Sequence, residues 1–244
     1  MNALKHISEF QSLLANYQLS PLAIQTLTQT QIALLVGPTG AGRNTIIAEL
    51  LKTGDYHHIV SDTTRELRVK DGVPIEKNGR EYWFRSEEEV LADLRKGAYV
   101  EAAIIHKQQV SGWNVREIEA ALQVQKIAIK DIEPSGAASV HRIKPDASII
   151  FVVPPSFNDW MTRLRSRSYL PEDELRRRLQ SACDEMRTAL SSDYYTFVVN
   201  DKLETAVATI HDMTKRGIHN AAQIAAARTL VEQLHKEATA YLQR

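Results

Sequence analysis

A glycine-rich segment near the N-terminus has the residue types and spacing that bind a phosphate chain. Residues 37–42 read Gly-Pro-Thr-Gly-Ala-Gly, between an apolar run at 32–36 and a segment at 45–52 with the apolar spacing of a helix. In this setting, the backbone N–H groups of the loop and the N-terminus of the helix surround phosphate oxygens. A glycine-rich turn that binds nothing is the alternative, but strand, loop length and helix all agree with phosphate binding. The sequence therefore predicts a nucleotide-phosphate site formed by Gly37, Pro38, Thr39, Gly40, Ala41, Gly42, Arg43, Asn44 and Thr45.

The residues after this loop differ from the common phosphate-loop pattern G-x-x-x-x-G-K-[ST]. Arg43 takes the place of the lysine, Asn44 takes the place of the serine or threonine, and Thr45 follows. A guanidinium keeps the positive charge, but it is bulkier and forked, whereas a lysine ammonium follows the β- and γ-phosphates as a compact charge. The loop by itself therefore supports nucleotide binding more strongly than catalysis.

Two arginines three residues apart, Arg65 and Arg68, share a short polar segment with the hydroxyl group of Ser61. Arginine donates pairs of hydrogen bonds to oxyanions, and this suits the dianion of a phosphate monoester. No run of carboxylates stands beside the two arginines to neutralise them. We therefore predict a second phosphate site here, with a solvated basic edge as the alternative.

Buried strands that alternate with helices are expected to position these residues. Apolar runs of strand length occur at 32–36, 127–129, 149–153 and 196–199, with helical patterns such as 115–125 and 174–190 between them. This order is typical of a parallel sheet with helices on both faces. Residues 61–85 differ, because they are polar and carry the turn signals Asp71-Gly72 and Asn78-Gly79. We predict an α/β fold with a parallel-sheet core, flanking helices and an inserted β-rich subdomain.

Both ends of the chain are predicted to be helical. Two short helices precede the first strand, and Ser20-Pro21 has the pattern of an N-cap followed by proline at the first helical position. Near the C-terminus, apolar residues alternate in steps of four and three at Ala227, Val231, Leu234, Ala238 and Tyr241. Such a helix packs on another helix, and docking onto the same chain is favoured over a dimer seam because the repeat is short.

The composition is that of an ordinary globular protein and excludes several other classes. The chain has 244 residues, of which 43% are hydrophobic and 25% are charged. Thirty Lys and Arg balance 30 Asp and Glu, so no overall basic field favours a nucleic acid or an anionic membrane. The single cysteine, Cys183, excludes an intramolecular disulfide, and no apolar run reaches the length of a signal peptide or membrane span. We expect a cytoplasmic protein without nucleic-acid or membrane partners.

Taken in order, the motifs of the chain resemble those of the guanylate kinase family. GPTGAGRNT, SDTTRELR, NGREYWF, DIEPSG, RLRSR…RRRL and FVVND follow one another from about residue 32 to about residue 210. The resemblance implies a P-loop core with a GMP-binding insert and a helical lid, which transfers a phosphoryl group from ATP to GMP with Mg²⁺. It places a kinase-like domain at 31–215, with the insert at about 61–110 and the lid at about 163–180. An N-terminal helical extension (1–30) and a C-terminal helical tail (216–244) lie outside it, and the protein is expected to be a monomer or a homodimer.

The resemblance also implies which residues bind GMP. Tyr82 matches the family tyrosine that contacts the acceptor phosphate, beside Ser61, Arg65 and Arg68. Glu101 and Glu133 match the two carboxylates that accept hydrogen bonds from guanine. Because a carboxylate accepts but does not donate, it favours guanine over adenine.

Further residues are implied on the ATP side. Arg163, Arg167 and Arg178 match three family arginines that, with the cation at position 43, neutralise charge on the transferring phosphoryl group. Asn200 matches the residue beside the adenine of ATP. Asp131 follows a predicted strand, where P-loop enzymes place an acidic residue near Mg²⁺.

Two other functions stay open besides a guanylate kinase. The first is a guanylate kinase-like binding module with weak or no turnover, which Arg43 and the replacement of the family's Tyr-Gly-Thr run by Ser111-Gly112-Trp113 favour. No role follows for Trp113 itself. The arginines of the lid oppose this alternative, because they have little use without turnover of ATP. The second is a sugar-phosphate kinase, which Glu101 and Glu133 oppose.

Overall fold

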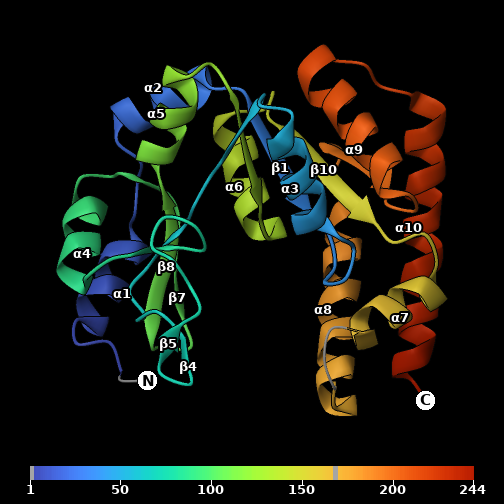
Figure 1. The fold of residues 1–244 in the computed structure, drawn as a ribbon, viewed down its shortest axis with the longest axis horizontal. Helices are drawn as coiled ribbons and strands as arrows, with labels where there is room; N and C mark the ends of the chain where they lie inside the picture. Colours follow the sequence, from blue (N-terminus) through green and yellow to red (C-terminus); the bar gives the residue numbers. More distant parts are fainter. Residues whose placement is uncertain (1–2, 167–169) are drawn as a thin grey trace. The chain divides into compact units, whose positions relative to one another are not determined.

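The computed structural model describes residues 3–166 and 170–244, and it divides the chain into two compact units (Figure 1). Unit 1 comprises the residues up to 31 together with residues 57–128. Unit 2 comprises residues 32–56 and 129–244. Both units are therefore discontinuous in sequence.

Unit 2 is built on a parallel sheet. The strands β1(Ile32–Val36), β2(Tyr56–His58), β9(Ile127–Asp131), β10(Ser148–Val153) and β11(Tyr195–Val199) lie in the order β11-β10-β1-β9-β2, and the sequence boundaries of the two units fall within β2 and β9. β10 pairs in parallel with both β1 and β11. Every residue of β1 is buried, as expected for a strand with helices on both faces of its sheet. The predicted parallel core is confirmed, and each predicted strand agrees with the structure to within two residues.

Helices surround this sheet. They are α3(Arg43–Lys52), α6(Pro134–Ile143), α7(Phe157–Ser166), α8(Glu172–Ser191), α9(Leu203–His211) and α10(Ala221–Leu242), with a π-helical turn, η1(Asp212–Arg216). The C-terminal helix α10 packs along α8 and against β11, as the sequence predicts. Four of its five predicted contact residues are buried: Ala227, Val231, Leu234 and Ala238. α3 begins at Arg43, two residues earlier than expected.

Unit 1 contains the predicted β-rich insertion. Its sheet has the order β6-β3-β8-β7, formed by β3(Asp62–Thr63), β6(Trp83–Phe84), β7(Tyr99–Ile105) and β8(Gln109–Asn114). A separate hairpin joins β4(Val69–Lys70) to β5(Val73–Pro74) through Asp71-Gly72, which both have positive φ angles as the turn signal predicts. β7 and β8 were not predicted, because burial along β7 does not alternate strictly between its two faces.

The N-terminal helices belong to unit 1. Its helices are α1(Ile7–Ala15), α2(Pro21–Gln29), α4(Glu87–Arg95) and α5(Val115–Gln123). The Ser20 hydroxyl accepts a hydrogen bond from the backbone N–H of Ala23 at 3.2 Å, which confirms the predicted N-cap. Phe10 of α1 is fully buried in a core with Leu94 and Tyr99. The Glu87 carboxylate accepts hydrogen bonds from the backbone of Lys5 and His6, so the extension is bonded to the insert.

Among the helices that the structure describes, none combines the length and the hydropathy of a membrane-spanning segment.

Candidate active site

The glycine-rich loop, residues 37–42, follows β1 directly and leads into α3, as predicted. Gly37, Gly40 and Gly42 have φ angles of +139°, +89° and +95°, which residues with a side chain rarely adopt. A Cβ at Gly37 would lie 2.5 Å from the carbonyl oxygen of Val152, and one at Gly42 would lie 2.3 Å from Nδ2 of Asn200. Glycine is therefore required at both positions. The loop ends at the N-terminus of a ten-residue helix, where backbone N–H groups favour an anion.

Two side chains from later in the chain hold this loop in place. Asn200 Nδ2 donates a hydrogen bond to the carbonyl oxygen of Ala41 at 2.7 Å, and Trp160 Nε1 donates to that of Thr39 at 2.8 Å. Arg163 Nη2 in turn donates to the carbonyl oxygen of Asn200 at 3.0 Å. The structure thus brings Arg163 and Asn200 to the loop. Sequence reasoning did not identify Trp160, because a tryptophan on an amphipathic helix carries no sign that its N–H group has a distant partner.

A cavity of about 260 Å³ opens beside the loop. It is lined by Gly40, Gly42, Thr45, Arg163, Ser166, Asn200, Asp201 and Leu203. The cavity thus combines two glycines of the loop with Thr45, Arg163 and Asn200, which the sequence analysis assigned to the ATP side.

Arg43 is the first residue of α3, and its guanidinium extends toward the segment between β9 and α6. Its Nη1 donates a long hydrogen bond, 3.4 Å, to the carbonyl oxygen of Ile132. The half-buried carboxyl group of Glu185 on α8 interacts electrostatically with Arg43. Burial raises the pKa of Glu185 to about 7; the Arg43 guanidinium opposes this rise, and the Glu133 carboxylate adds to it. Sequence reasoning missed Glu185, which lies far from position 43 along the chain.

The other predicted lid arginines differ in their placement. Arg178 lies on α8, and its Nε donates a 2.8 Å hydrogen bond to Glu174, one turn earlier on the same helix. About a third of its side chain is exposed. Arg167 lies outside the described residues.

Two of the predicted acceptor-phosphate residues, Arg65 and Arg68, meet in unit 1 at a carboxylate that the sequence analysis did not single out. Arg65 Nη1 and Nη2 each donate to the carboxylate of Glu76 at 2.6 Å, and the backbone N–H of Arg68 donates to the same carboxylate at 2.8 Å. These bonds hold the pKa of Glu76 at about 2, and the hydrogen bond from Arg65 has the largest effect. The Arg65 guanidinium also lies over the ring of Tyr82, 5.0 Å from its centroid. Arg65 therefore has a neutralising carboxylate, that of Glu76, although the sequence showed no run of carboxylates beside the two arginines.

The side chain of Arg68 is 69% exposed. Ser61 lies just before β3, and its carbonyl oxygen accepts a hydrogen bond from the backbone N–H of Trp83 at 2.8 Å. Residues 64–68 line a cavity of about 880 Å³ in unit 1, to which Lys5 of the N-terminal extension also contributes.

Two buried carboxylates, Asp62 and Glu117, join the segments on either side of Ser61 to other parts of unit 1. Asp62 accepts hydrogen bonds from the hydroxyl group of Tyr99 at 2.5 Å and from Nη1 of Arg116 at 3.1 Å. Glu117 accepts from the backbone N–H of Val60 and from Nε1 of Trp83, both at 3.0 Å. Buried carboxylates are stable only with such partners. The network therefore anchors the residues on both sides of Ser61.

The two predicted guanine-binding carboxylates lie in different units. Glu101, on β7, pairs across the hairpin with Trp113 of β8 and accepts a 3.2 Å hydrogen bond from its Nε1. The fully buried Trp113 thus orients Glu101, a role that the sequence did not reveal. Glu133 is the N-cap residue of α6 in unit 2, and Asp131 is the last residue of β9.

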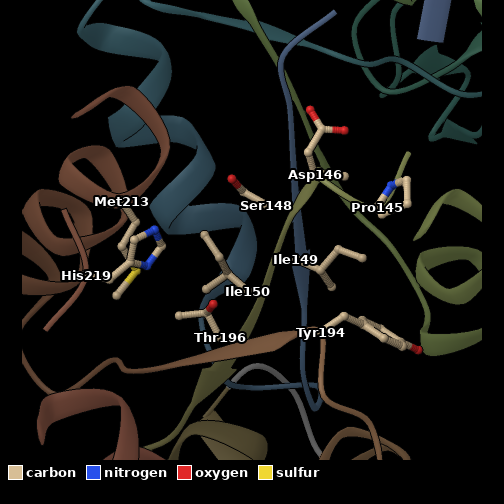
Figure 2. A pocket seen from close by; sticks show the side chains of 10 residues that line it. Pro145, Asp146, Ser148, Ile149, Ile150, Tyr194, Thr196, Met213 and His219 are labelled. Carbon is tan, nitrogen blue, oxygen red and sulfur yellow. The ribbon is translucent and has the colours of Figure 1, made fainter. Parts of the chain in front are cut away.

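A further cavity of about 180 Å³ lies in unit 2, near the beginning of β10 and β11 (Figure 2). Figure 2 shows Ile149, Ile150 and Thr196 of these strands together with Tyr194 and His219. The glycine-rich loop follows the opposite, carboxyl end of β1, which runs parallel to β10. None of the predicted site residues lines this cavity.

Comparison with known proteins identifies the family of the chain. The sequence model of the guanylate kinase family matches residues 29–216. A guanylate kinase of Corynebacterium diphtheriae is 32% identical over 185 residues, which are 75% of this chain and 93% of the relative. A guanylate kinase of Rubrobacter xylanophilus is 35% identical over 187 residues, 76% of this chain and 94% of the relative.

A solved structure has a similar fold. The crystal structure of guanylate kinase from Anaplasma phagocytophilum superimposes with a TM-score of 0.56 and 24% sequence identity, covering 84% of this chain and 94% of that chain.

Proposed function

Because the chain belongs to the guanylate kinase family, we infer that it is an ATP-dependent kinase that transfers the γ-phosphoryl group of ATP to GMP, giving ADP and GDP. The observation that best supports this function is the glycine-rich loop between β1 and α3. Asn200 donates a hydrogen bond to this loop, and Arg163 donates one to Asn200. The reaction takes place in the cytoplasm, and the enzyme is a monomer or a homodimer.

On the donor side, the protein has little covalent chemistry to perform. Phosphoryl transfer is accelerated mainly by positioning and by stabilisation of negative charge. Backbone N–H groups of the glycine-rich loop and of the first turn of α3 hold the ATP phosphates, except at Pro38, which has no N–H, and at Ala41, whose N–H donates to the carbonyl oxygen of Pro38. Asn200 holds the loop beside the adenine. Arg43, Arg163, Arg167 and Arg178 supply positive charge to the oxygens of the transferring group.

On the acceptor side, Arg65 and Arg68 bind the phosphate group of GMP, with Ser61 and Tyr82 as hydroxyl donors. The guanidinium of Arg65 is already oriented by Glu76, so phosphate binding does not have to order it. Glu101 and Glu133 accept hydrogen bonds from guanine, and the bond from Trp113 fixes the direction of the Glu101 carboxylate.

The residues present fit a magnesium ion that arrives with ATP. Among the described residues, no group of three or more His, Cys, Asp or Glu side chains is placed to hold a metal. Mg²⁺ in kinases takes one or two carboxylates, substrate phosphates and water, and the carboxylate of Asp131 at the end of β9 is a donor of this type. We propose that Asp131 holds Mg²⁺, which neutralises charge on the β- and γ-phosphates when bound.

An assay of ADP release with GMP, AMP, CMP and UMP in turn tests this function. GMP is expected to support turnover, and it should raise the melting temperature far more than AMP does, because it binds preferentially to the native state. Equal stabilisation by all four monophosphates would contradict the assignment of Glu101 and Glu133.

The second candidate function is a guanylate kinase-like binding module, which the arginine at position 43 favours. Stabilisation by GMP without any ADP release would support that function and contradict the enzyme.

A further inference from the structure

The indole of Trp160, on α7, bonds directly to the glycine-rich loop. We propose that Trp160 is a positioning residue for the donor phosphates: by holding the carbonyl group of Thr39, it directs the N–H of Gly40 toward the phosphates of ATP. This inference rests on the proposed function of the loop. It concerns an indole N–H that none of the motifs in the sequence singles out.

The first support is the hydrogen bond of the indole. Only 1% of Trp160 is exposed, and its Nε1 donates to the carbonyl oxygen of Thr39 at 2.8 Å. A buried indole N–H needs an acceptor, and this distance is that of a well-formed hydrogen bond. The peptide between Thr39 and Gly40 is trans and planar, so its N–H points to the side opposite its carbonyl group. The bond from Trp160 therefore fixes the direction of the Gly40 N–H.

The second support is the close packing of α7 against Gly40. A Cβ at this position would lie 3.3 Å from Cδ1 of Trp160 and 3.3 Å from Cδ2 of Leu164. The backbone of the loop thus lies directly against the helix, which a side chain at position 40 would push away. Gly40 also lines the cavity of about 260 Å³. The loop is therefore held against α7 at a residue that borders the cavity.

The third support is the pattern of N–H groups along the loop. Pro38 has no N–H, and the N–H of Ala41 donates to the carbonyl oxygen of Pro38 at 3.0 Å. Neither residue offers an N–H to a phosphate. Asn200 holds the carbonyl group of Ala41, so it orients the N–H of Gly42 as Trp160 orients that of the preceding glycine. The two side chains therefore fix alternate peptides of the loop, 39–40 and 41–42.

Two further aromatic rings stand behind the indole. Phe157, one turn earlier on α7, packs edge-on against Trp160, with ring centroids 6.0 Å apart. Tyr241, near the end of α10, lies beside Phe157, with ring centroids 6.1 Å apart. The family match ends at residue 216, so Tyr241 belongs to the part of the chain beyond it. The C-terminal helix therefore supports the indole through Phe157.

Removing the indole N–H tests the proposal. Trp160→Phe keeps an aromatic ring in the core but cannot donate to Thr39. The dissociation constant of AMP-PNP, a non-hydrolysable ATP analogue, should rise about tenfold in the presence of Mg²⁺, while that of GMP changes less than about twofold. An unchanged affinity for AMP-PNP would overturn the proposal. An equal loss of affinity for both nucleotides would also overturn it, because it would show a general structural role.

Trp83→Phe is the matched control. It removes the same N–H group from a tryptophan of unit 1, where Nε1 donates to Glu117 at 3.0 Å. This variant should leave the affinity for AMP-PNP within about twofold of the wild type. Equal weakening in Trp83→Phe and Trp160→Phe would contradict a specific effect on the loop.

A measurement on the wild type does not depend on how well the variants fold. The dipeptide Thr-Gly occurs twice in the chain, at 39–40 and at 53–54. Protein labelled with ¹³C at the threonine carbonyl and ¹⁵N at glycine therefore gives two carbonyl–amide cross-peaks by NMR, and Thr53→Ser identifies one of them. AMP-PNP with Mg²⁺ should shift the amide resonance of Gly40 but not that of Gly54, which lies in the turn after α3. An unshifted Gly40 amide in the saturated wild type would overturn the proposal.

This proposal and the proposed function fail in different ways. A wild type that binds AMP-PNP but makes no GDP would contradict the kinase function, whereas the comparison of Trp160→Phe with Trp83→Phe would still decide the role of Trp160. A wild type that does not bind AMP-PNP would overturn both.

Discussion

Arg65 and Glu76 form a two-armed ion pair in which both guanidinium Nη atoms lie 2.6 Å from the carboxylate oxygens. Only 8% of each side chain is exposed. The same carboxylate also accepts the backbone N–H of Arg68, so it joins both predicted acceptor-phosphate arginines. The pair therefore sets the direction in which Arg65 presents its remaining N–H groups.

Replacing Glu76 should impair GMP binding although Glu76 itself carries the wrong charge to bind phosphate. In Glu76→Gln, Arg65 loses its charged partner and its fixed direction, because an amide replaces one of the two acceptor oxygens with an NH₂ group, which donates and cannot accept from the guanidinium. We expect KM for GMP to rise several-fold while KM for ATP stays within about twofold. Steady-state kinetics with each substrate varied in turn measures both. A lower KM for GMP would instead show that Glu76 competes with the acceptor phosphate for Arg65.

Arg178 and its neighbour Arg177 form a matched pair for testing the lid. Both are ion-paired to Glu174, but 71% of the Arg177 side chain is exposed, twice the exposure of Arg178. Arg178→Ala should lower kcat at least ~10²-fold with little change in the dissociation constant of GMP, because the charge acts on the transition state. Arg177→Ala should leave kcat nearly unchanged. Equal losses in the two variants would refute a specific role for Arg178.

The pKa of Glu185 predicts how stability depends on pH in the absence of nucleotide. A carboxyl group whose pKa rises from an ordinary 4.5 to about 7 on folding binds its proton more tightly in the folded state. Its contribution to stability is therefore complete below about pH 4.5 and is lost as the pH rises through 7, by about 3 kcal/mol in total.

Urea unfolding at pH 5 and pH 8 measures this effect. Glu185→Gln should lose less stability than the wild type between the two pH values, whereas Asp184→Asn should behave like the wild type. If Glu185→Gln and the wild type lose equal stability, then Glu185 titrates normally.

The N-terminal extension should contribute to the stability of unit 1. Phe10→Ala leaves a cavity in the core that α1 shares with α4 and β7, and this should lower the free energy of unfolding by about 3–5 kcal/mol. Leu22→Ala is the control, because that side chain is 66% exposed and its loss should cost less than about 0.5 kcal/mol. Similar urea midpoints for the two variants would show that α1 is not part of the core.

The sequence predicts those parts of the structure whose signal is local. The glycine-rich loop is recognisable because the apolar run before it, its three glycines and the helix after it are contiguous. The same is true of the Ser20 N-cap and of the turn at Asp71-Gly72. In each case a backbone conformation depends on residues within a few positions, so the pattern and the structure agree.

The partners of the site residues could not be predicted in the same way. Glu76 is an ordinary acidic residue in a polar stretch of sequence, and only the fold brings it to Arg65. Trp113 appeared as a departure from the family pattern, yet its N–H group orients Glu101 across a hairpin. Hydrogen bonds and ion pairs between distant segments leave no local pattern, so they appear only when the strands are paired.

The discontinuity of both units also constrains the order in which the protein matures on the ribosome. Domains generally fold as units during translation, with the N-terminal part first. Here α1 is synthesised before α4 and β7, the elements with which it shares a core, and β1 is synthesised before β10, its parallel neighbour. Neither unit can complete its core from its N-terminal segment alone, and β1, the apolar strand that precedes the glycine-rich loop, lacks its partner β10 until residues 148–153 have been synthesised. Chaperone binding to the nascent polypeptide should therefore concentrate on residues 32–36.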